Sequence, residues 1–144
     1  MSLVISAEPP EAKDWVRLRA SVGWNLFAVE KAAEALAKTS FCVTAYENGE
    51  LVGMARVVDD GCIVFNIHDV IVVPERQHNG VGDMLMNEVM KYISKNAAPN
   101  ALVALMSILD MEGFYERYGF VKRPNEKSGC GMSFRYDEAK HKFE

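Results

Sequence analysis

Residues 70–90 read VIVVPERQHNGVGDMLMNEVM, in which four β-forming residues lead through a proline and a polar loop into a helical pattern. Gly80 and Gly82 stand where the helix should begin, although glycine costs a helix about 1 kcal/mol relative to alanine. The first turn of a helix has backbone N–H groups without partners and carries partial positive charge. Two missing side chains let an anion reach those groups, so this order suits a phosphate or pyrophosphate. A tight turn with a close helix–strand contact is the alternative explanation.

Two other phosphate-binding loops do not fit this segment. A P-loop requires G-x-x-x-x-G-K-[ST], and the chain contains neither Gly-Lys-Ser nor Gly-Lys-Thr. The dinucleotide-binding fingerprint requires a third glycine, and Leu85 stands at that position. The nucleotide interpretations are therefore disfavoured.

A second group of chemically capable residues lies just upstream, in NIHDVIVV at residues 66–73. An aspartate inside so apolar a strand is unusual and indicates either a partner or a function. Regular alternation places Asp69 on the same face as Ile71 and Val73, with His68 opposite, unless a β-bulge intervenes. The alternative is that Asp69 caps or bridges nearby backbone groups.

Composition limits what kind of protein positions these residues. The hydrophobic share of 49% and charged share of 25% are those of a soluble globular protein, and 144 residues suit one domain. The net charge of −4 argues against nucleic acid binding through a broad basic face. No apolar run approaches the ~18 residues of a membrane span, and the first residues lack a signal-peptide pattern.

The cysteines bear on the compartment and on metals. Cys42, Cys62 and Cys130 are odd in number and far apart, which favours three reduced thiols in the cytoplasm and disfavours a zinc site.

Periodicity and turn residues predict a single mixed α/β domain over residues 1–144, with a frayed tail at 137–144. Asn48-Gly49 predicts a tight hairpin turn, and Gly119 can end a short helix. The strand at 101–107 is apolar throughout, as expected for a strand buried on both faces. The expected strands are 3–6, 41–46, 50–58, 62–73, 101–107 and 129–136, and the expected helices are 9–22, 29–40, 81–95 and a short one within 109–120.

The loop belongs to a longer pattern, Val-x-Pro-x-x-Gln-x-x-Gly-x-Gly, formed by Val72, Pro74, Gln77, Gly80 and Gly82. It resembles the acetyl-CoA signature of the GNAT superfamily of N-acetyltransferases. GFYERYGFVKRP at residues 113–124 resembles the second motif of that superfamily, F-Y-E-x-x-G-F. The two motifs lie in the expected order, separated by one helix and one strand, so the resemblance covers essentially the whole chain.

The resemblance implies a GNAT-type fold, with a mostly antiparallel sheet of about six to seven strands flanked by about four helices. The strand ending at Val73 would splay from the strand at 101–107 to admit acetyl-CoA as co-substrate, without a metal. Backbone groups of the strand end would pair with the pantetheine arm, and loop amides would hold the pyrophosphate. The implied cofactor-binding residues are Ile71, Val72, Val73, Gln77, His78, Asn79, Gly80, Val81, Gly82 and Asp83.

The loop departs from the superfamily's common form in one respect. Members often carry a Gly-Lys pair before the first glycine, where this chain has His78 and Asn79. Positive charge must then come from backbone amides and from Arg76, unless Arg76 is a solvated loop residue.

Transfer of acetyl to an amine requires a neutral amine, a polarised thioester carbonyl and a proton for the leaving thiolate. The resemblance places Tyr115 as the general acid, and a phenol of pKa ~10 suits that role. A backbone N–H near Val72 is the expected donor to the carbonyl oxygen. Asp69 is the predicted base or amine-binding group, with His68 as a weaker candidate. The aromatic neighbours of Tyr115 are expected only to pack a short helix.

The amine acceptor is expected to lie against the N-terminal helices and the hairpin. Trp24, which follows Gly23, is either a core residue or a wall of the acceptor pocket. Arg56 is a candidate ligand for a carboxylate or phosphate of the substrate, and His68 for the amine. Arg17 and Arg19 are expected to be solvated.

The predicted function is therefore acetyl transfer from acetyl-CoA to a primary amine of a small molecule by direct attack in a ternary complex. Cys130 is expected to be a small buried residue and not a nucleophile, because no Cys-His pairing is evident. The alternatives are acetylation of a protein lysine or N-terminus, and a non-catalytic acyl-CoA-binding regulatory module. The resemblance also makes a homodimer a candidate assembly.

Overall fold

The computed structural model describes residues 2–142, and five helices, one 3-10 turn and five strands lie among them. The strands are β1 Leu3–Ser6, β2 Phe41–Glu47, β3 Glu50–Asp59, β4 Val64–Val72 and β5 Leu102–Leu105. The helices are α1 Ala12–Ser21, α2 Val29–Ala37, α3 Val81–Asn96, α4 Glu112–Glu116 and α5 Glu138–His141, and the 3-10 turn is Pro74–Arg76. The mixed α/β fold predicted from the sequence is confirmed, with fewer strands than predicted.

The chain divides into two compact units, Met1–Leu105 and Met106–Glu144. The first unit contains all five strands with α1, α2 and α3, and the second contains α4 and α5. The single domain expected over the whole chain stays a prediction. In the second unit, the Asp137 side chain accepts a hydrogen bond from Ala139 N (2.9 Å) and caps α5. Residues 143 and 144 of the predicted tail lie outside the described residues.

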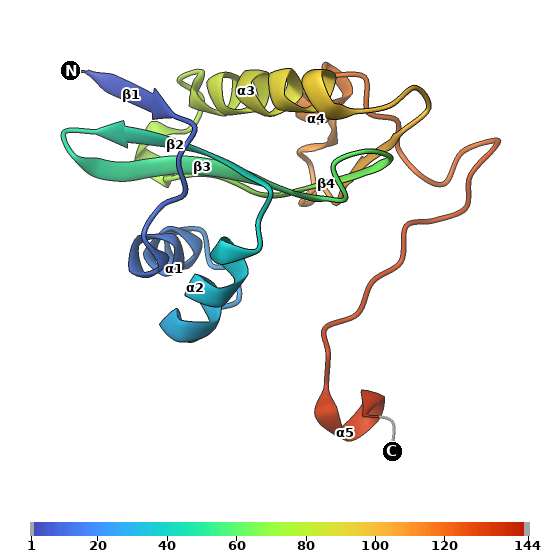
Figure 1. The fold of residues 1–144 in the computed structure, drawn as a ribbon, viewed down its shortest axis with the longest axis horizontal. Helices are drawn as coiled ribbons and strands as arrows, with labels where there is room; N and C mark the ends of the chain where they lie inside the picture. The colour runs from blue at the N-terminus through green and yellow to red at the C-terminus, as the bar shows by residue number, and fades with distance from the viewer. Residues whose placement is uncertain (1, 143–144) are drawn as a thin grey trace. The chain divides into compact units, whose positions relative to one another are not determined.

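The sheet of the first unit has the strand order β1-β2-β3-β4-β5. Its first four strands pair antiparallel in succession, and β5 pairs parallel to β4. Figure 1 shows α3 on one face of this sheet and α1 and α2 on the other. The hairpin between β2 and β3 turns at Asn48 and Gly49, whose φ angles are +52° and +77°, which confirms the tight turn predicted there.

The core forms mainly between α3 and the middle strands. Leu85, Val89 and Ile93 recur at helical spacing on α3 and are buried, as their spacing predicts. Gly53 of β3 lies under the start of this helix. A Cβ there would be 3.1 Å from Ile71 O, 3.2 Å from Leu85 Cδ1 and 3.3 Å from Val81 Cγ1. Glycine thus allows the first turns of α3 to approach the sheet closely.

Two predictions about strands are wrong. The strand at 101–107 is shortened to β5 and is not buried on both faces, because Leu102 is 56% exposed and β5 is the last strand of the sheet. Residues 129–136 form no strand, although Met132, Phe134 and Tyr136 alternate and are 91%, 69% and 66% exposed. Alternation shows that a segment can pair, but pairing also needs a neighbouring edge to satisfy the backbone.

We expect Gly53→Ala to lower the free energy of unfolding by about 1–3 kcal/mol, because the added methyl group presses on a backbone carbonyl and on two α3 side chains. Gly113→Ala is the control, since a Cβ at Gly113 meets nothing within 4 Å. Denaturant unfolding followed by circular dichroism checks both variants. Equal stability of the two variants would contradict the close approach of α3.

Candidate functional site

Strand β4 extends beyond the segment that pairs with β5. The parallel register runs from Val64↔Leu102 to Ile67↔Leu105, whereas β4 continues to Val72. β4 is therefore unpaired with β5 from His68 onward. The resemblance described above implies such a parting for the strand that ends at Val73.

The end of β4 presents backbone groups on this open side. Val73 N donates to Val52 O on β3 (2.9 Å), and the next pair along the register is Gly53↔Val72. Since hydrogen-bonded and non-bonded pairs alternate in antiparallel strands, the N–H and C=O of Val72 point away from β3. Gln77 Nε2 donates to Val72 O (2.9 Å). The N–H of Val72 therefore points toward the side of β4 on which pairing with β5 has already ended.

The glycine loop connects this strand end to a long helix. Gly80 is the N-cap of α3 in the left-handed conformation, with φ +84°, and a Cβ there would contact nothing within 4 Å. Gly80 is accordingly required by backbone conformation and not by crowding. Gly82 and Asp83 follow in the first turn of the 16-residue helix. The helix N-terminus that the sequence predicts beside the strand end is present.

Arg76 holds the loop to the far end of β2. Its Nε donates to Glu47 Oε1 (2.8 Å), and its Nη2 donates to the same oxygen. The hydrogen bond from Arg76 is the main cause that lowers the pKa of the Glu47 carboxyl, and the same bond raises the pKa of Arg76. Arg76 is neither simply solvated nor unpaired, so it acts first as a tether of the loop.

A β-bulge lies at the other end of the open segment. The register between β3 and β4 shifts between Met54↔Ile71 and Arg56↔His68, so one residue of β3 faces two of β4. Asp69 occupies the bulge with φ +53°. The bulge interrupts regular alternation at the residue for which the sequence left that exception open.

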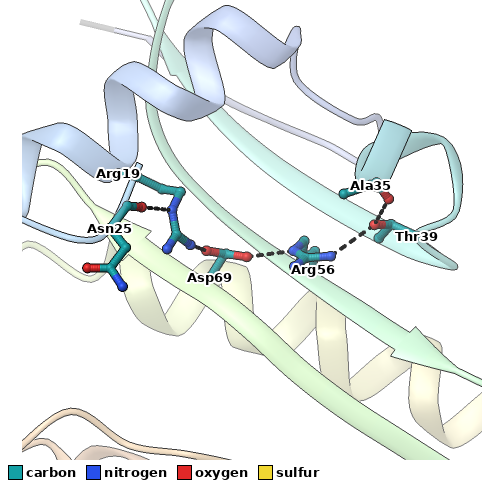
Figure 2. Close-up of polar contacts among 6 residues, drawn as sticks. All are labelled: Arg19, Asn25, Ala35, Thr39, Arg56 and Asp69. Carbon is teal, nitrogen blue, oxygen red and sulfur yellow. Dashed lines mark hydrogen bonds and ion pairs between the residues drawn. The ribbon is translucent and has the colours of Figure 1, made fainter. Parts of the chain in front are cut away.

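The carboxylate of Asp69 is shared by two arginines, as Figure 2 shows. Arg19 Nη1 of α1 donates to Oδ1, and Arg56 Nε of β3 donates to Oδ2 at 2.5 Å. The side chains of Asp69, Arg19 and Arg56 are 3%, 9% and 17% exposed. Asp69 therefore bridges neighbouring groups, as the alternative interpretation held, but through side chains and not through the backbone.

The network extends beyond the three charges in both directions (Figure 2). Arg19 Nε donates to Asn25 O (2.8 Å) in the segment after α1. Arg56 Nη1 donates to Thr39 Oγ1 (3.1 Å), which donates to Ala35 O (2.9 Å) at the end of α2. One buried carboxylate thus connects α1, the segment that follows it, α2, β3 and β4.

Residues 24–28 contact this network through Arg19. The Arg19 guanidinium lies 5.5 Å from the ring centre of Trp24 and 5.2 Å from that of Phe27, within the range of cation–π attraction. Trp24 is half-buried and Phe27 is 48% exposed. Trp24 is consequently not a core residue, and its place in the wall of an acceptor pocket stays a prediction.

His68 is exposed beside the bulge. The register pairs His68 with Arg56, so the side chains of His68 and Arg56 leave the sheet on the same face. Arg56 also binds Asp69, so His68 does not lie opposite Asp69 as regular alternation would require. Neighbouring protein atoms lower the pKa of the His68 imidazole, and Arg56 lowers it further, while Asp69 opposes the shift. A lowered pKa keeps the imidazole neutral at pH 7.

Tyr115 belongs to α4 of the second unit. Its ring contacts those of Phe114 and Phe120, with centroids 5.0 and 6.3 Å apart, and burial raises the pKa of its phenol to about 12. The phenol therefore holds its proton at neutral pH. Phe114 and Tyr118 pack edge to face, 5.7 Å apart, as expected of an aromatic group that packs a short helix.

Two expectations about single residues are wrong. Cys130 is exposed, because the segment that contains it forms no strand. The sequence predicts a solvated Arg19, but the residue as a whole is only 7% exposed. The available signal was spacing: Arg19 stands four residues after Trp15 and next to Leu18, both buried, so it lies on the inner stripe of α1. Arg17 is exposed, as expected.

Two features are absent from the part of the chain that the structure describes. Within residues 2–142, no group of three or more histidine, cysteine or acidic side chains is arranged to hold a metal ion. In the same part of the chain, no helix is long and apolar enough to cross a membrane.

We expect Arg19→Met to lower the free energy of unfolding by about 2–3 kcal/mol, because it removes a buried partner from a carboxylate that stays buried. Arg17→Met on the same helix should change it by less than about 0.5 kcal/mol, since its ion pairs with Glu50 (3.4 Å) and Asp14 (3.9 Å) are exposed. Urea denaturation of the two variants checks the difference. Similar losses would show that the network adds no stability.

Comparison with known proteins agrees with this architecture. The profile of the family "Acetyltransferase (GNAT) domain" matches residues 20–135. An uncharacterized N-acetyltransferase, ycf52, of Porphyra purpurea is 29% identical over 113 residues, which cover 76% of this chain and 64% of that protein. The chain thus spans somewhat less than two thirds of the length of this curated relative.

Two crystal structures have the same fold. A protein from meticillin-resistant Staphylococcus aureus, titled "Probable Acetyltransferase", is 30% identical, with a TM-score of 0.86 over 94% of this chain and 100% of that chain. A GNAT-family acetyltransferase from Streptococcus pneumoniae is 24% identical, with a TM-score of 0.78 over 94% and 100% of the two chains, and at this identity it shows the fold alone. The parted strands, the glycine loop at the start of α3 and the family match together establish that this chain belongs to the GNAT superfamily of acetyltransferases.

Proposed function

We propose that the chain transfers the acetyl group of acetyl-CoA to a primary amine of a small molecule. One observation carries this proposal. The chain passes from a strand edge at Val72 that is not paired with β5, through the glycine loop, to the N-terminus of a 16-residue helix. Pantetheine carries amide groups that a strand edge can pair with, and a diphosphate suits a helix N-terminus. The residues present therefore fit acetyl-CoA.

The individual cofactor contacts follow from the same geometry. The N–H of Val72 and neighbouring backbone groups of Ile71 and Val73 would hold the pantetheine amides. Amides from Gln77 to Gly82 would hold the diphosphate, with Gln77 also fixing the strand end through Val72 O. Because Arg76 is paired with Glu47, the loop would bind the diphosphate mainly through backbone amides.

The chemistry requires that the amine nitrogen bond to the acetyl carbon while the bond from that carbon to sulfur breaks. A backbone N–H at the strand edge would stabilise the carbonyl oxygen as it gains charge. We assign the proton donor to Tyr115 on the motif match, since its phenol carries the proton that a leaving thiolate requires. Its proton would go to the leaving thiolate.

The acceptor is proposed to lie against residues 24–28 and the charged network that they contact through Arg19. Trp24 offers an aromatic wall, and Arg19 and Arg56 bring more positive charge than Asp69 neutralises. The overall net charge of −4 mildly favours a small amine over a protein acceptor. Acetylation of a protein lysine or N-terminus, and acyl-CoA binding without turnover, are the competing functions.

One assay separates these functions. Release of CoA thiol from acetyl-CoA is measured with a panel of polyamines, aminoglycosides, amino acids and peptides, and CoA binding is measured by calorimetry. We expect saturable turnover with at least one small amine and none with the peptides. Turnover only with peptides would favour a protein acceptor, and tight CoA binding without any turnover would favour the binding module.

We expect Tyr115→Phe to lower kcat by about 10²-fold, because the thiolate then leaves without a positioned proton donor. The KM for acetyl-CoA should change little, since the phenol hydroxyl is not assigned to cofactor binding. Steady-state kinetics with the best amine of the panel check both values, and Tyr136→Phe provides a control at an exposed tyrosine. Unchanged turnover of Tyr115→Phe would remove this residue from the mechanism.

A further inference from the structure

The proton acceptor for the amine is the part of the reaction that the motifs leave open. Asp69 is the obvious acidic group on β4, but each of its carboxylate oxygens already accepts from a guanidinium, Oδ1 from Arg19 and Oδ2 from Arg56. Proton uptake by this carboxylate would disrupt a charge-assisted hydrogen bond in a buried site. Asp69 is thus poorly suited to take a proton in each turnover.

His68 stands next to Asp69 with the opposite properties. It is exposed, and within the described part of the chain its ring nitrogens make no hydrogen bond to protein groups. It is the first residue of β4 beyond Ile67↔Leu105, the last pair with β5. His68 therefore lies where the two strands part, at the start of the open edge that leads to Val72.

The charges around His68 favour a neutral imidazole. Arg56 faces it from β3, and Asp69 is its neighbour on β4. Arg19 of α1 neutralises part of the Asp69 charge, so the three side chains together carry an excess positive charge. Burial by the surrounding protein is the main cause that lowers the pKa of His68, Arg56 lowers it further, and Asp69 opposes the shift. A neutral imidazole can accept a proton at pH 7, and an imidazolium cannot.

We propose that His68 is the group that accepts a proton from the acceptor amine, directly or through one water, and that Asp69 is a positioning residue. The inference rests on the proposed acetyl transfer. Over the reaction the ammonium loses two protons as its nitrogen bonds to the acetyl carbon. One proton passes to His68 and on to solvent. Tyr115 gives its own proton to the thiolate, and the second proton from the nitrogen restores the Tyr115 phenol through solvent, so that the amide, the CoA thiol and one free proton result.

The bulge gives Asp69 its positioning role. The backbone of Asp69 is left-handed, with φ +53°. This conformation allows two consecutive side chains of β4, those of His68 and Asp69, to project from the same face of the sheet. The ion pairs to Arg19 and Arg56 then fix that arrangement from α1 and β3. Asp69 acts on the amine only through His68, whose place beside Arg56 it helps to fix.

The test is the pH dependence of kcat for the unmodified chain, His68→Gln and His141→Gln, with an amine that the panel shows to be acetylated. His141 packs on Phe134 in the second unit and serves as a matched histidine control. We expect kcat of the unmodified chain and of His141→Gln to fall as the pH drops through the lowered pKa of His68. His68→Gln should lower kcat by about 10²-fold and lose this acid limb, with an unchanged KM for acetyl-CoA and partial rescue by added imidazole.

The outcomes are distinct. If His68→Gln retains the acid limb, or keeps kcat within about twofold of the unmodified chain, His68 is not the proton acceptor although acetyl transfer stands. A raised KM for acetyl-CoA with unchanged kcat would also overturn the assignment. If the unmodified chain acetylates no amine of the panel, the proposed function fails, and this inference fails with it.

Discussion

The structure around the site depends on one buried carboxylate shared between two guanidinium groups. Asp69 lies in a backbone conformation that is unfavourable for a non-glycine residue, and its ion pairs with Arg19 and Arg56 offset that cost. Because these arginines come from α1 and β3, the same interaction fixes the bulge and joins the N-terminal helix to the sheet. The bulge and the attachment of α1 to the sheet therefore depend on electrostatics as well as on packing.

The two ends of the open β4 segment are held by different means. At Asp69 the strand is fixed by ion pairs, and at Val72 it is fixed by Gln77 and by the β3 register. Beyond Val72, Arg76 connects the glycine loop to Glu47, and the first turns of α3 pack closely against Gly53. The backbone groups proposed to bind the cofactor thus lie between fixed points, which is the preorganisation that thioester chemistry needs.

The sequence could predict those features that depend on local patterns. The hairpin at Asn48-Gly49, the inner stripe of α3 and the glycine loop all follow from spacing and residue type. Partners distant in sequence could not be found that way: Arg19 and Asp69 are fifty positions apart, and nothing local marks Arg19 as buried except its place on the stripe of Trp15 and Leu18. Residues 129–136 show the converse, since their alternation is strand-like but the segment forms no strand.

The adjacent pair His68 and Asp69 explains why residue type alone is a poor guide to the proton acceptor. In the sequence, the aspartate in an apolar strand is the more unusual of the two residues, so it is the one predicted to be the base. In the structure both oxygens of this buried carboxylate accept from guanidinium groups, whereas burial and Arg56 disfavour a charged imidazole at His68. Neighbouring groups pushed toward opposite charge states are a recurrent basis for dividing acid–base roles. Here the division gives the buried residue the structural part and the exposed residue the chemical one.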